Sequence, residues 1–126
     1  MGFATVEKKG SRVVVRFNSV PKDDKDCSDY LHRLNYIYKK KQKFVILFDA
    51  YNVGFVSLKH IKKQVNFMRN KEEETRKYMV RAAILVSSSV SKLVVNSIFA
   101  IKKPVVPCRV FVNAEEAKAY LRAADF

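Results

Sequence analysis

Few side chains in this sequence are of the types that perform covalent or metal chemistry. The chain has two histidines, His32 and His60, and neither has a Cys, Asp or Glu at the spacing of a metal-binding motif. The apolar periodicity around them predicts that both lie on outward faces of helices. Cys27 and Cys108 lie within apolar patterns, which indicates buried thiols and not a disulfide framework or a zinc site. We therefore predict no metal site, and two free thiols weakly favour a reducing compartment.

The glycine-centred and serine-centred motifs of nucleotide-binding proteins and hydrolases are missing from the sequence. The acidic runs at 23–29 and 72–74 lack the alternation and the glycine of a calcium loop, and helix capping explains them. We predict that the protein is not an enzyme, has no catalytic residues and needs no cofactor. By this reading it works by binding a partner.

Positive charge is the strongest compositional signal. The chain carries 25 Lys and Arg against 12 Asp and Glu, a formal net charge of +13, and both halves share the excess. Such a field favours nucleic acid, an anionic membrane surface or an acidic protein, although solubility explains it equally well. The candidate basic patch comprises a dense cluster and a group on a predicted helix: Lys39, Lys40, Lys41 and Lys43, with Lys59, Lys62 and Lys63.

Length and hydrophobic content are those of one small globular domain. The 126 residues are 48% hydrophobic, enough to bury a core without metals or disulfides. The apolar runs fall far short of the roughly 20 residues that span a bilayer, and charges interrupt the N-terminus before a secretory signal can form. We expect residues 1–126 to form a single intracellular domain, in the cytoplasm.

Short apolar runs predict the strands. Residues 3–8 and 12–17 are predicted to form a hairpin that turns at Gly10, because glycine tolerates a positive φ. The apolar run at 44–48 follows a predicted helix, which implies a parallel crossover and a buried central strand. Two further strands are predicted at 82–86 and 109–112.

Apolar spacing and capping residues predict the helices. The first helix carries one apolar stripe: Cys27, Tyr30, Leu31, Leu34, Ile37 and Tyr38. Ser57 is the predicted N-cap of a long second helix, bent near Asn70, with an apolar seam: Leu58, Ile61, Val65, Met68, Thr75 and Met79. A third helix starts at Ser87–Ser89 and carries Val90, Leu93, Val94, Ile98 and Ile101. Asn113 and Glu116 cap the last helix. The predicted order is β-β-α-β-α-β-α-β-α.

This arrangement resembles a known family in several tracts. The strand at 44–49, the loop before Ser57 and the segments MVRAAILVSSSVSKLVVNSIF and PVVPCRVFVNAEEAKAYL resemble the SpoIIAA-like (STAS) family of anti-sigma-factor antagonists. The resemblance covers nearly the whole chain and implies an α/β fold, a mixed sheet with helices packed on it. A more distant similarity links it to the lipid-binding Sec14-like fold, but 126 residues leave little room for an enclosed acyl chain.

The resemblance implies a protein-interaction module that docks its partner through the loop and helix start around Asp49–Ser57. The candidate contact residues are Asp49, Tyr51, Asn52 and Ser57. In phosphorylatable members an Asp-Ser-Ser-Gly-like segment opens the second helix, whereas this chain reads Phe-Val-Ser-Leu-Lys and keeps only Ser57. Ser57 is therefore either a phosphorylation site or simply an N-cap. Two alternatives stay open: binding of nucleic acid or an anionic membrane surface through the basic helix faces, and a structural subunit of a larger particle.

Overall fold

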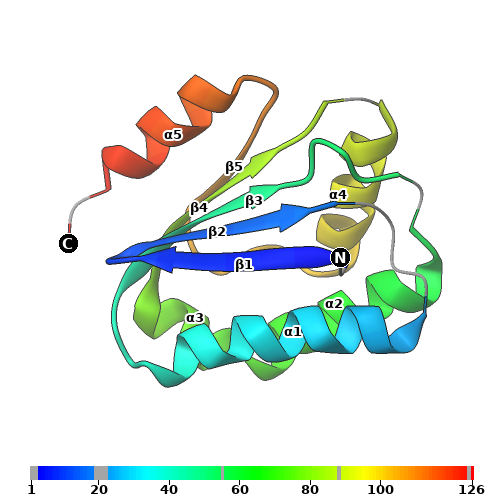
Figure 1. Ribbon diagram of the computed structural model, residues 1–126, viewed down its shortest axis with the longest axis horizontal. Helices are drawn as coiled ribbons and strands as arrows, with labels where there is room; N and C mark the ends of the chain where they lie inside the picture. Colours follow the sequence, from blue (N-terminus) through cyan, green and yellow to red (C-terminus); the bar gives the residue numbers. More distant parts are fainter. Residues whose placement is uncertain (1–2, 19–22, 55, 88, 125) are drawn as a thin grey trace.

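The computed structural model describes residues 3–18, 23–54, 56–87, 89–124 and 126. One sheet contains all five strands found there, in the order β1-β2-β3-β4-β5 (Figure 1). Their bounds are β1 Ala4–Lys9, β2 Arg12–Phe17, β3 Phe44–Asp49, β4 Met79–Leu85 and β5 Cys108–Phe111. β1 pairs antiparallel with β2, and each later pair is parallel. The predicted mixed sheet is confirmed, with β3 as its central strand.

Local sequence explains the hairpin and the central strand. Gly10 has a φ of +59°, a conformation that a residue without a Cβ adopts at little cost, and it turns β1 into β2. In β3 the four residues Phe44–Leu47 are all buried. A run of this kind suits a strand with layers on both faces, because successive side chains point to opposite sides of the sheet.

Five helices lie between or after the strands in the described part of the chain. They are α1 Asp24–Lys39, α2 Leu58–Asn70, α3 Glu72–Tyr78, α4 Ser89–Ile101 and α5 Ala114–Arg122. The predicted long second helix is thus two helices, α2 and α3, separated at Lys71. Three glutamates open α3, and negative side chains stabilise a helix N-terminus, so they favour a new start. Met79, predicted to be in the helical seam, instead begins β4.

The helices cover the two faces of the sheet unequally. Three long helices, α1, α2 and α4, lie on the face that carries Val13, Val15, Ile46 and Ile84, with the seven-residue α3 beside them. In contrast, α5 alone packs on the face of Val45, Leu47 and Ala83. Figure 1 shows α5 on one side of the sheet and the α1–α3 layer on the other. We call these the three-helix face and the α5 face.

Side-chain caps define where three helices begin. Asp23 Oδ1 accepts the Asp26 N–H at 3.0 Å, Ser57 Oγ accepts the His60 N–H at 3.4 Å, and Asn113 Oδ1 accepts the Glu116 N–H at 3.0 Å. Each cap satisfies one of the amide donors left free at a helix start. The predicted caps at Ser57 and Asn113 are confirmed.

The orientation of α4 differs from a simple reading of its sequence. Ser91 and Val95 are its buried residues, whereas Val90, Leu93 and Ile101 are exposed. At about 100° per residue the three exposed side chains lie within an arc of about 80°. The helix is apolar on both its inner and outer faces, so hydrophobic spacing did not distinguish them.

Candidate functional site

The loop between β3 and α2 contains the residues predicted to contact a partner. Asp49 is partly buried and bonded within the molecule: its Oδ2 lies 3.4 Å from Arg16 Nε, and its Oδ1 accepts the Tyr51 N–H at 3.1 Å. Tyr51, Asn52 and Ser57 are exposed. Asp49 therefore shapes the turn, and the other three residues face solvent. Phe55, within the predicted loop, lies outside the described residues.

Hydrogen bonds join this loop to the start of α4. Ser87 Oγ donates to the Tyr51 carbonyl oxygen, and the Ala50 N–H donates to the Leu85 carbonyl oxygen at 2.9 Å. The Ser87 N–H in turn donates to Ser91 Oγ, in the first turn of α4, at 3.1 Å. The parallel strands β3 and β4 end at the same edge, so their following loops and helix starts lie together.

Four exposed apolar or aromatic side chains belong to these elements. The exposed fractions are 50% for Tyr51, 58% for Leu58, 43% for Val90 and 57% for Leu93. We define the docking surface as Tyr51, Asn52, Ser57, Leu58, Val90 and Leu93. Leu58 was predicted to be in the apolar seam of the second helix, which is wrong: it lies at the first position of α2, directly after the cap, and faces solvent.

His60 is not a surface residue, contrary to the prediction. Only 13% of its side chain is exposed, its Nδ1 lies 3.1 Å from Ser57 Oγ, and its Nε2 lies 3.4 Å from Asp24 Oδ1. The Nε2 contact is an electrostatic approach without hydrogen-bond geometry. Asp24 comes from the start of α1, a separation of 36 positions that sequence spacing does not reveal. His32 is exposed, as predicted.

Charge pairing connects the N-terminal ends of α1 and α2. Lys59 Nζ lies 2.8 Å from Asp24 Oδ2. A hydrogen bond from Lys59 lowers the pKa of the Asp24 carboxyl, and nearby Lys63 contributes to the same direction. Lys59 is thus partly neutralised within the molecule, which leaves less charge for a partner.

The structure divides the predicted basic patch. Lys59, Lys62 and Lys63 lie near the N-terminal end of α2, whose Lys59 contacts the start of α1, whereas Lys39 ends α1. A 16-residue helix is about 24 Å long at about 1.5 Å per residue, so the two groups lie at opposite ends of the layer.

The cluster that follows α1 is itself dispersed. Lys39 and Lys41 line a groove shared with α3, which Glu73 and Glu74 also line. Lys40 instead lies over the Tyr36 ring, 4.7 Å from its centroid. The sequence period predicted that at least one of these lysines points away from the others. Lys43, on the approach to β3, is exposed.

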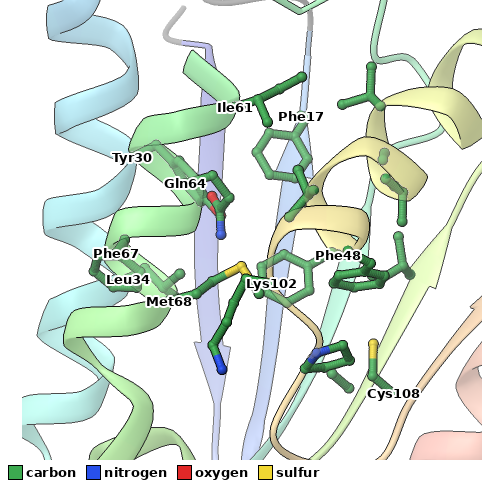
Figure 2. A pocket seen from close by; sticks show the side chains of 18 of the residues that line it. Phe17, Tyr30, Leu34, Phe48, Ile61, Gln64, Phe67, Met68, Lys102 and Cys108 are labelled. Atoms are coloured by element: carbon green, nitrogen blue, oxygen red, sulfur yellow. The ribbon is translucent and has the colours of Figure 1, made fainter. Parts of the chain in front are cut away.

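A cavity of about 180 Å³ lies between the three-helix face of the sheet and helices α1, α2 and α4. Figure 2 shows Phe17 and Phe48 on the strand side and Gln64 and Met68 extending from α2. The lining is predominantly apolar. Tyr30, fully covered by the core, shares a hydrogen bond with Gln64, and burial raises the pKa of its hydroxyl.

Both cysteines line this cavity as free thiols. Cys27 is buried as predicted, whereas Cys108 is partly exposed. Burial raises the pKa of both thiols, that of Cys108 to about 11. A thiol with a raised pKa is a poor nucleophile at neutral pH, because the thiolate is the reactive form. These cysteines therefore serve as apolar lining of the cavity.

The part of the chain that the structure describes contains neither a cluster of metal-ligating side chains nor a membrane-spanning helix. No group of three or more His, Cys, Asp or Glu residues there is arranged to hold a metal ion. Within the same part of the chain, no helix combines the length and the apolar character needed to cross a bilayer.

The sheet order, the antiparallel first pair and the helices on both faces match the SpoIIAA-like α/β fold. The model of the family described as Domain of unknown function (DUF7793) matches residues 35–125, and the chain belongs to this family. Comparison with curated protein sequences gives no match.

Solved structures of other proteins are similar to this chain. A DUF3478-family protein with a SpoIIAA-like fold from Shewanella loihica PV-4 has a TM-score of 0.67 and 12% identity, covering 94% of this chain and 91% of that one. An anti-sigma factor antagonist from Mycobacterium paratuberculosis has a TM-score of 0.66 and 12% identity, covering 94% and 92%. The anti-sigma factor antagonist SpoIIAA in its unphosphorylated form has a TM-score of 0.66 and 15% identity, covering 98% and 99%. At these identities the likeness concerns the fold.

Two features of this site were not predicted from the sequence. The outward apolar face of α4 had no distinguishing signal, because Val90, Leu93, Val94 and Ile98 lie within an arc of about 140°, which one contact face can also cover. The approach of His60 to Asp24 had none, because it depends on how α1 and α2 pack.

Proposed function

We propose that this chain is a non-catalytic protein-interaction module that binds another protein through the docking surface. The observation that carries the proposal is the set of apolar side chains left exposed by three elements at one edge of the sheet. Tyr51, Leu58 and Leu93 each have half or more of their surface in solvent. Exposed apolar side chains gathered on neighbouring elements are typical of protein contact sites, and aromatic residues are enriched at the centres of such sites.

The surrounding charge favours a partner with acidic residues around an apolar patch. Lys62 on α2 and Lys92 on α4 are both exposed, and neither makes an ion pair within the described residues. Complementary charge at the rim of an interface steers association and selects the partner. The structural neighbours named anti-sigma factor antagonists support protein binding as the general role.

The geometry of Ser57 supports a role without catalysis. Ser57, His60 and Asp24 are the residue types of a serine nucleophile, its base and an orienting carboxylate. Ser57 Oγ lies within hydrogen-bond distance of His60 Nδ1, at 3.1 Å, but His60 Nε2 makes no hydrogen bond to Asp24. An activated serine needs a base that a third group orients by a hydrogen bond. We interpret the three residues as a helix cap and an ionic contact between helices.

We also propose Ser57 as a phosphorylation site that switches binding off. Its hydroxyl is exposed at the N-terminus of α2, where a phosphate is electrostatically favourable. A phosphate there would add about −1.5 to −2 charges beside Leu58 and oppose apolar contact. The two free thiols favour the reducing cytoplasm as the compartment of this function.

Capture of a partner with matched variants tests the docking surface. The chain should be immobilised and exposed to native extract, treated with nuclease so that nucleic acid cannot bridge proteins. Leu58→Lys combined with Leu93→Lys should abolish capture of a specific protein, because the changes place charges in the apolar patch. Tyr36→Lys is the control, since Tyr36 is 61% exposed on α1, away from the docking surface. Equal loss with the control variant would refute the proposal.

A pair of substitutions at Ser57 tests the switch. Ser57→Asp keeps a capping side chain and the stability of α2, but adds charge, and should reduce capture at least tenfold. Ser57→Ala should retain capture and lose any phosphate that mass spectrometry detects at this position after incubation with extract and ATP. Full capture by Ser57→Asp would contradict a phosphorylation switch while leaving the docking proposal intact.

A further inference from the structure

The cavity on the three-helix face has the size of a small hydrocarbon. Its volume is about 180 Å³, and its walls come from the sheet, α1, α2, α4 and the segment after α4. An apolar protein cavity of about 150 Å³ is large enough to bind benzene. The space therefore accommodates an aliphatic chain of about six to eight carbons and is too small for a long acyl chain.

Most of the cavity lining is apolar, and several of its polar groups already have partners within the protein, whereas His60 Nε2 has no hydrogen bond. Tyr30 and Gln64 are hydrogen-bonded to each other, and Ser91 Oγ accepts the Ser87 N–H. Polar ligand atoms placed against the apolar walls or beside Tyr30, Gln64 and Ser91 would lack free partners, which is costly in an apolar site. The inner part of the ligand must accordingly be hydrocarbon.

Two lysines lie at one end of the cavity. Lys102 and Lys103 follow α4 and both contribute to the lining. Lys102 Nζ lies 2.6 Å from Glu72 Oε1, and Figure 2 shows its side chain between α2 and the segment after α4. Lys103 is exposed and has no ion pair within the described residues. This end offers one unneutralised positive charge.

We propose that the cavity binds a linear monocarboxylate of about six to eight carbons, with its chain against Phe17 and Phe48 and its carboxylate at Lys103. A single anionic group matches the unpaired Lys103, and an unbranched hydrocarbon chain matches the predominantly apolar wall. The site lies between α2, α4 and the sheet and does not depend on the docking surface.

Calorimetric titration of the full chain with butanoate, hexanoate, octanoate and decanoate tests the hydrocarbon part. Affinity should rise about three- to fourfold for each added methylene and stop rising near eight carbons, where the cavity is full. Ala82→Leu, which adds a side chain inside the cavity, should abolish binding. If that variant does not fold, Val94→Phe fills the same space from α4. Binding that survives in a folded filled variant would show surface adsorption and overturn the proposal.

The head group is tested with a neutral ligand of equal length. Octanoate should bind at least threefold more tightly than octanol to the wild-type chain, and Lys103→Gln should reduce octanoate to the affinity of octanol without changing octanol. Lys92→Gln, on the outer side of α4, is the matched control and should change neither. Equal affinity of the wild-type chain for both ligands would overturn the carboxylate class, and absence of binding by the whole series would overturn the site.

Discussion

The two faces of the sheet differ in how well their helices fill the space above the strands. On the three-helix face, three helices leave a cavity of about 180 Å³. On the α5 face, a single nine-residue helix buries Ala117 and Leu121 against β3, β4 and β5. The face with more helices is therefore covered more completely but packed less densely.

Two adjacent alanines in β4 explain much of this difference. Ala83 points to the α5 face and is completely buried, as is Ala117 of α5, so two small residues allow the helix to approach the sheet closely. Ala82 points to the other face and lines the cavity. There α2 and α4 contact each other but leave the space above Ala82 unfilled. A small residue therefore permits close packing only where the facing helix can move in.

The largest expected effect comes from charging the α5 face. Leu47→Asp places a carboxylate among buried apolar residues of β3 and should unfold the chain, at a cost of several kcal/mol. Circular dichroism and chemical denaturation measure this loss. Val112→Asp is the control, because Val112 is 72% exposed and should keep wild-type stability within about 0.5 kcal/mol. A Leu47→Asp chain that melts like wild type would show that the α5 face is not a core.

The second largest effect is expected at high pH, where the three-helix face should lose stability. Burial raises the pKa of Tyr38 to about 12 from its ordinary 10, and Tyr38 is neutral in both states below pH 10. Between pH 10 and 12 the unfolded chain ionises while the folded chain does not, so stability falls by about 2–3 kcal/mol in total. Urea denaturation from pH 9 to 11 should reveal the slope. Tyr38→Phe should make it shallower despite losing the Thr75 hydrogen bond; an unchanged slope would contradict the assignment.

The same substitution at Ala82 and at Ala83 compares the free space on the two faces of the sheet. Ala83→Leu should cost about 1–3 kcal/mol, because the α5 face has no room for three more carbons. Ala82→Leu adds the same atoms to the cavity and should leave stability unchanged or raise it by about 1 kcal/mol. Thermal melting of the two variants compares them at equal composition. Equal destabilisation would show that the faces are filled equally.

The smallest effect concerns the lysines that follow α1. We expect a small loss of stability when all four are changed to Gln: Lys39, Lys40, Lys41 and Lys43. The free energy of unfolding should fall by a few tenths of a kcal/mol for each of them that lies near the helix C-terminus. These lysine side chains point in different directions, and acidic residues line the same groove, so the affinity for nucleic acid should change little. Filter binding at about 50 mM salt measures it, since polyanion contacts are strongest at low salt. A large loss of affinity with a shallower salt slope would restore the basic-patch alternative.

Sequence patterns with a purely local cause were sufficient to predict most elements. The central strand, the hairpin at Gly10 and the caps at Ser57 and Asn113 depend on neighbouring residues, and the structure confirms them. The break at Lys71 was expected near Asn70 as a bend, although the start of a separate helix was not. The resemblance to the SpoIIAA-like family also predicted the fold correctly, because strand and helix order is visible in the sequence.

Tertiary packing alone decided which apolar side chains became core and which became surface. Leu58, Val90 and Leu93 have the same hydrophobicity as their buried neighbours, and only the placement of α2 and α4 leaves them in solvent. The approach of His60 to Asp24 and the space above Ala82 likewise depend on distances between elements far apart in sequence. Local periodicity determines that a helix forms and which residues share a face. How closely that face meets its neighbours depends on the summed shapes of all the elements around it.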